Sequence, residues 1–83
     1  PDPEVYLTTA KKMGIDPREQ LAFEDSKTGV TAARAAGSLV IGMPVYDMPH
    51  VWSGLREAGA IRIFMDWREM NIKALLSNIN RAV

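Results

Sequence analysis

Segments with helical periodicity alternate with short apolar runs along this chain of 83 residues. In the first segment, residues repeat at i, i+3, i+4 and i+7, the spacing that places them on one face of a helix. These residues are Tyr6, Thr9, Ala10 and Met13. Asp2 and Pro3 are typical of a helix start, and Gly14 is typical of a left-handed helix end. The pattern therefore predicts a helix from about residue 2 to residue 13.

Three short apolar runs predict buried strands. They are Leu21–Phe23, Leu39–Met43 and Ile61–Met65. Glu24 and Asp25 follow the first run directly, and Pro44 stops the second because proline cannot donate a hydrogen bond to a neighbouring strand.

Three further helices are predicted between and after these runs. The first is alanine-rich, covers residues 27–36 before Gly37, and has either Asp25 or Ser26 as its N-cap. The second presents Val51, Leu55 and Ala58 on one face and ends at Gly59. The last follows Asp66 and Glu69, which have the spacing of a capping box, and its apolar face is formed by Ile72, Leu75, Leu76 and Ile79.

Strands that alternate with helices indicate right-handed crossovers and a parallel sheet. We therefore expect an α/β fold, a three-stranded parallel sheet with flanking helices, in a single domain over residues 1–83. A chain of this length buries a thin core, because the buried fraction of the surface falls with size.

Composition and charge exclude several classes of protein. The chain is 47% hydrophobic and 24% charged, which is typical of a globular domain. Its ten basic and ten acidic residues cancel, so it lacks the basic excess of a nucleic-acid-binding protein. The longest apolar run is far shorter than the roughly 20 residues of a membrane helix, and residues 1–4 are unlike a signal peptide. Because the chain has no cysteine, it is expected to be cytoplasmic. From its charge and apolar runs we expect no nucleic-acid or membrane partner. Its start at Pro1 suggests processing or truncation.

The acidic pair Glu24 and Asp25 is the strongest candidate for chemistry. Ligands of open parallel sheets bind beyond the carboxyl ends of the strands, where this pair is expected to lie. Two carboxylates suit Mg²⁺, which takes oxygen ligands, and the helix start after Ser26 favours an anion beside it. A purely structural interpretation remains open, in which Glu24 only ends a strand and Asp25 and Ser26 only cap a helix.

Three segments together resemble the haloacid dehalogenase-like (HAD) hydrolase superfamily: residues 1–6, residues 21–30 (Leu-Ala-Phe-Glu-Asp-Ser-Lys-Thr-Gly-Val) and residues 32–37 (Ala-Ala-Arg-Ala-Ala-Gly). The similarity is to the branch of sugar phosphatases and β-phosphoglucomutases. It is strong over residues 1–43 and weaker beyond them.

The resemblance implies a Rossmann-like core, of which this chain is the C-terminal half, and Mg²⁺-dependent phosphoryl transfer through a phospho-aspartate. It implies that Asp25 is the direct metal ligand and that Glu24 is a second carboxylate ligand or orients the site. Ser26 is expected to shape the loop near the phosphate.

The chain also departs from the family pattern. It has no Asp-x-Asp-Gly motif for the nucleophile, no lysine before the Pro1–Pro3 match and no cap domain. We therefore expect that the chain contains no catalytic residue and is inactive by itself. It would be the C-terminal segment of a phosphatase or phosphomutase that acts on a small phosphorylated metabolite. Its partner is expected to be the missing N-terminal half of the core or a second copy. The alternative is a non-catalytic truncated or pseudoenzyme module that folds by pairing with another chain.

Overall fold

The computed structural model describes residues 2–69, 71 and 73–77. In chain order the elements are α1 (Glu4–Met13), the 3-10 turn η1 (Pro17–Glu19), β1 (Leu21–Glu24), α2 (Lys27–Ala35), β2 (Leu39–Gly42), α3 (Pro49–Ala58), β3 (Arg62–Ile63) and the 3-10 turn η2 (Trp67–Glu69). Residues 73–77 are also helical. No helix among the described residues is long and apolar enough to cross a membrane.

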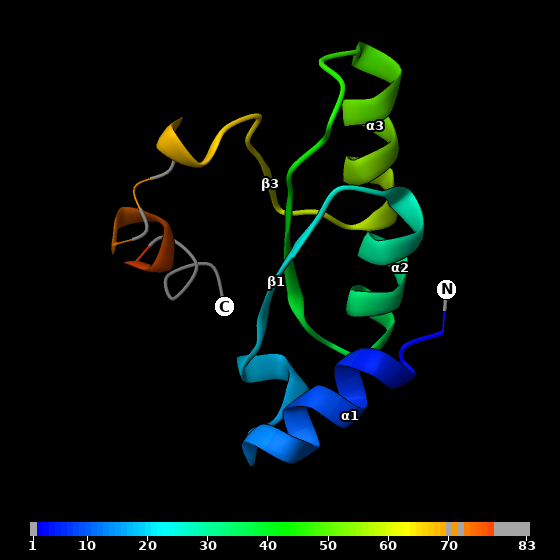
Figure 1. The fold of residues 1–83 in the computed structure, drawn as a ribbon, viewed down its shortest axis with the longest axis vertical. Helices are drawn as coiled ribbons and strands as arrows, with labels where there is room; N and C mark the ends of the chain where they lie inside the picture. The colour runs from blue at the N-terminus through cyan, green and yellow to red at the C-terminus, as the bar shows by residue number, and fades with distance from the viewer. Residues whose placement is uncertain (1, 70, 72, 78–83) are drawn as a thin grey trace.

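The three strands form one parallel sheet in the order β1-β2-β3, which confirms the predicted fold class. The register pairs Leu21 with Leu39 and Glu24 with Gly42, so β1 and β2 end together. Helices α2 and α3 lie side by side along one face of the sheet, whereas the C-terminal helical residues lie on the other side (Figure 1). Helix α1 lies below the sheet, near the amino ends of the strands (Figure 1).

Alternation along the strands divides the core into two layers. Between the sheet and helices α2 and α3, the buried residues are Ala22, Val30, Ala33, Val40 and Leu55. On the opposite face Ile41 and Leu75 are buried, while Leu21, Phe23, Leu39 and Met43 are only partly buried. One face is therefore well covered and the other is half covered.

Helix α1 buries less than its periodicity indicates. Ala10 is fully buried and Tyr6 packs against the core, but Thr9 is exposed and Met13 is 62% exposed. The reason is its position, because a helix that lies at the end of the sheet contacts the core over a short length only.

The third strand is shorter than the predicted Ile61–Met65. Only Arg62 and Ile63 form it, because they pair with Ile41 and Gly42, the last two residues of β2. Beyond this short pairing the chain has no strand to follow and turns away toward η2 (Figure 1).

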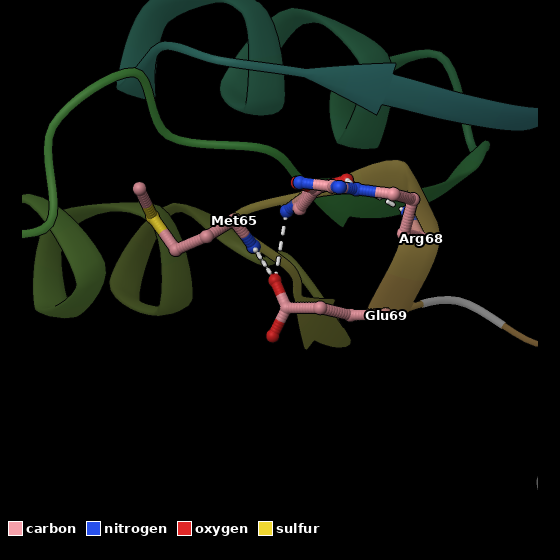
Figure 2. A network of polar contacts seen from close by, with 4 residues as sticks. Met65, Arg68 and Glu69 are labelled. Carbon is pink, nitrogen blue, oxygen red and sulfur yellow. Dashed lines mark hydrogen bonds and ion pairs between the residues drawn. The ribbon is translucent and has the colours of Figure 1, made fainter.

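The cap expected for the last helix belongs to the turn η2. Glu69 Oε1 accepts hydrogen bonds from the N–H groups of Met65 (2.9 Å) and Asp66 (2.8 Å), as Figure 2 shows. Glu69 therefore makes its half of the predicted capping box, whereas the Asp66 Oδ1 atom accepts from the Arg68 N–H group at 2.8 Å. The cap closes a 3-10 turn.

A separate cap precedes the helical residues 73–77. There the Asn71 Oδ1 atom accepts a hydrogen bond from the Ala74 N–H group at 3.0 Å. Of the predicted apolar face, Leu75 is buried and Leu76 is 45% exposed. Ile72 and Ile79 lie outside the described residues.

The pattern Asp-x-Arg-Glu occurs twice, at residues 16–19 and 66–69, and forms a 3-10 turn each time. In both turns the aspartate pairs with the arginine two residues later, at 2.8 Å for Asp16–Arg18 and 2.6 Å for Asp66–Arg68. The hydrogen bond from the Arg18 side chain, joined by that from its backbone N–H, lowers the pKa of Asp16 from 3.8 to about 2.

We expect the Asp16 turn to be pH-sensitive between these two values. Because the pKa is depressed in the folded chain, the contribution to stability is complete above pH 3.8 and is lost as the pH falls through about 2. NMR titration of the Asp16 carboxyl carbon should give a midpoint near 2 that returns toward 3.8 in Arg18→Ala. Arg68→Ala, the same change in the second turn, should leave Asp16 unaltered. A titration midpoint of Asp16 near 3.8 in the unchanged chain would contradict the hydrogen bonds of this turn.

Candidate functional site

The predicted site residues lie together at the carboxyl edge of the sheet. Glu24 is the last residue of β1, Asp25 and Ser26 form a bend, and α2 begins at the next residue. The Met43 N–H group donates to the Glu24 carbonyl oxygen at 2.7 Å, which holds the end of β1 against the end of β2. The acidic pair therefore faces the edge at which open parallel sheets bind ligands.

Ser26 is the N-cap of α2. Its Oγ atom accepts a hydrogen bond from the Gly29 N–H group at 3.1 Å, and its backbone is extended, as expected for a residue just before a helix. The sequence had left Asp25 and Ser26 as equal candidates for this cap. Because Ser26 takes the role, the Asp25 side chain is left exposed beside the start of the helix.

The Glu24 side chain is half-buried and lies against the first turn of α2. A Cβ atom built at Gly29 would overlap the Glu24 carboxylate, so the two residues are in close contact. Burial raises the pKa of Glu24, and the neighbouring charge of Asp25 raises it further. A bound cation would favour the charged form of Glu24, because an opposite charge nearby offsets the effects of burial and of Asp25.

These residues fit Mg²⁺ as part of a site. Mg²⁺ is commonly bound by one or two carboxylates, with water and substrate phosphate as the remaining ligands. Asp25 and Glu24 supply two such carboxylates. Within the described part of the chain, no group of three or more histidine, cysteine, aspartate or glutamate side chains could hold a metal ion together. The pair would therefore hold the ion with waters and with ligands from other groups.

Gly29 is the site residue to which the sequence analysis assigned no role. It lies in the first turn of α2, where its N–H group bonds to Ser26 and its α-carbon lies against Glu24. The sequence carried a partial signal, since glycine in a helix is about 1 kcal/mol less favourable than alanine. Such a glycine is a candidate for close packing, although Gly54 in the helix Pro49–Ala58 has no close neighbour.

Curated relatives match half of the chain or more. No family model matches it. A phosphorylated carbohydrates phosphatase from Thermotoga maritima is 36% identical over 72 residues, which cover 87% of this chain and 33% of that protein. A β-phosphoglucomutase from Bacillus subtilis is 35% identical over 43 residues, which cover 52% of this chain and 19% of that protein.

Two solved structures superpose on nearly the whole of this chain. A HAD family hydrolase from Deinococcus radiodurans, crystallised with bound phosphate and sodium, superposes with a TM-score of 0.77 at 33% identity; the match covers 96% of this chain and 35% of that one. A haloacid dehalogenase-like protein from Agrobacterium tumefaciens gives a TM-score of 0.83 at 30% identity, with 96% and 36% covered.

The chain spans about a third of the T. maritima phosphatase and of both solved neighbours, an extent that fits a C-terminal part of the core. The curated relatives are phosphoryl-handling proteins by name, and the solved neighbours share the fold of this chain. The chain belongs to the haloacid dehalogenase-like hydrolase superfamily.

Proposed function

We propose that residues 1–83 are the C-terminal core segment of a Mg²⁺-dependent phosphatase that acts on a small phosphoester. The reaction would proceed through a phospho-aspartate whose carboxylate is not among these residues. One observation carries the proposal: the Glu24–Asp25 pair ends β1 directly before the helix start capped by Ser26. The phosphate and sodium in the D. radiodurans hydrolase support a site for an anion and a cation on this fold.

Each residue of the site has a separate role in this proposal. Asp25, the exposed carboxylate, binds the cation directly, and Glu24 provides a second carboxylate held against α2. Ser26 shapes the loop, since its hydroxyl is committed to the Gly29 N–H group. When bound, Mg²⁺ would neutralise charge on the phosphoryl oxygens. The free amides of the first turn of α2 favour an anion at the same edge.

The substrate class is supported by the relatives. They include a phosphorylated carbohydrates phosphatase, a β-phosphoglucomutase and a fructose-1-phosphate phosphatase. We propose a sugar phosphate or a similar phosphorylated metabolite for this chain, with hydrolysis or transfer of the phosphoryl group as the reaction.

Mg²⁺ titration of the chain, followed by amide chemical shifts, tests the site. We expect weak binding with shifts centred on Glu24, Asp25 and the first turn of α2, because water would supply many of the ligands. Asp25→Asn should weaken binding by more than roughly tenfold, since even loss of a residue that only orients a metal ligand costs about that much. Asp47→Asn, which changes an exposed aspartate in the loop after β2, is the matched control and should bind as the unchanged chain does.

Two outcomes would count against the proposal. Shifts centred on Asp47 or Asp66 would place the cation elsewhere, and an unchanged spectrum would favour the non-catalytic module.

The same chain should leave a generic aryl phosphate unhydrolysed, because covalent catalysis requires the nucleophile. Turnover that Asp25→Asn abolishes would mean that the chain contains its own catalytic carboxylate.

A further inference from the structure

We infer that Gly29 is a positioning residue of the acidic site, and that its missing side chain provides the space in which the Glu24 carboxylate lies against α2. The inference rests on the proposed function, because it assigns to Glu24 a fixed place beside Asp25. It adds a residue that binds neither cation nor phosphate and acts only through Glu24.

The contact geometry at position 29 carries the inference. A Cβ atom built there would lie 2.6 Å from the Glu24 Cδ atom and would overlap the Oε2 atom. Real Cβ atoms essentially never approach another heavy atom so closely. The same Cβ would lie 3.2 Å from the Ser26 Oγ atom, a tight contact with the cap itself. Any residue other than glycine would therefore have to displace the carboxylate.

Backbone conformation does not explain the glycine. The glycines with a positive φ are Gly14, Gly37 and Gly59 in the described part of the chain, and Gly29 is not among them. An alanine at position 29 could therefore adopt the same helical backbone. The reason for glycine at this position is the space beside it, which the Glu24 side chain occupies.

The expected effect is local to the site. The overlapped atoms are the end of a flexible side chain, so Gly29→Ala should move the Glu24 carboxylate without breaking the fold. Once displaced from the surface of α2, the carboxylate no longer lies at its fixed position next to Asp25. Cation binding should therefore weaken while the sheet and helices remain intact.

Gly54 offers a matched control. It lies inside helix α3, and a Cβ built there meets nothing within 4 Å. Gly54→Ala should stabilise the chain through helix propensity alone. Gly29→Ala in the first turn of α2 should also gain helix propensity, which the overlap with Glu24 should offset.

A double-mutant cycle in urea, at one protein concentration, separates the two effects. With Glu24 present, Gly29→Ala should raise the unfolding midpoint less than Gly54→Ala does, or should lower it. In the Glu24→Ala background both substitutions should raise the midpoint by similar amounts. Equal responses to Gly29→Ala in the two backgrounds would overturn the contact.

Mg²⁺ titration gives the second measurement. Gly29→Ala should lower the apparent affinity about tenfold, the scale seen when a residue that orients a metal ligand is lost, and Gly54→Ala should not change it. Unchanged affinity in Gly29→Ala would overturn the positioning role while leaving the effect of Asp25→Asn, and hence the proposed function, in place. Absence of Mg²⁺ binding by the unchanged chain would overturn the proposed function itself, and the inference with it.

Discussion

Replacing Leu55 by alanine is expected to destabilise the chain strongly. Leu55 of α3 is 1% exposed and belongs to the buried cluster that also contains Ala22, Val30, Ala33 and Val40. Truncation of a buried leucine costs about 2–5 kcal/mol, because contacts are lost and a cavity remains. At roughly 0.05–0.15 kcal/mol per residue, a domain of this length has only about 4–12 kcal/mol in total. The substitution should remove a large share of that stability.

A urea melt followed by far-UV circular dichroism measures this loss. Leu7→Ala in α1 is the control, since Leu7 is 40% exposed and its truncation should change the midpoint little. The effect should extend to the site, because Leu55 packs beneath Gly42, the residue paired with Glu24. A Leu55→Ala chain with an unchanged midpoint would show that the layer between the sheet and the helices is not the main core.

The isolated chain is expected to self-associate and not to be a stable monomer. In the described part of the chain, β1 lies at one edge of the sheet and has a neighbouring strand on the β2 side only. The sheet face that carries Leu21 and Leu39 is also half covered. Exposed strand edges recruit further strands, and an apolar face beside such an edge adds to the attraction. In a longer protein, the same edge would be available to the rest of the core.

Analytical ultracentrifugation over a range of concentrations, with a urea melt at each, tests this expectation. Leu21→Lys places a charge on the edge strand and should shift the chain toward the monomer, because charges on edge strands oppose pairing. Val5→Lys is the control, since Val5 is 67% exposed and belongs to α1, not to a strand. A cooperative monomer with a melt independent of concentration would refute the expectation and would favour an independently folded module.

The sequence by itself was sufficient for the type and order of the elements. The alternation of helical periodicity with apolar runs predicted three parallel strands, and the structure confirms them. Glycines after two periodic segments predicted helix ends, and Gly14 and Gly59 have left-handed φ values of 71° and 118°. These features depend on interactions between residues a few positions apart, so they can be read from local patterns.

The position of the acidic pair was also predictable, since it requires only that a buried strand ends before Glu24 and that a helix follows Ser26. The family resemblance predicted a metal-binding role for the pair, and that role remains a prediction. By sequence, Asp25 and Ser26 were equally suited to cap α2, and the choice between them required the structure. It assigned the cap of α2 to Ser26 and left Asp25 exposed.

Other features depended wholly on contacts between distant parts of the chain. The third strand is only as long as its pairing with Ile41 and Gly42, and α1 buries Ala10 but not Met13 because it lies at the end of the sheet. The fit of the Glu24 carboxylate against Gly29 requires β1 and α2 to be placed in three dimensions. Periodicity records which residues share a face, whereas burial and close approach depend on what packs against that face, and only the assembled sheet and helices decide that.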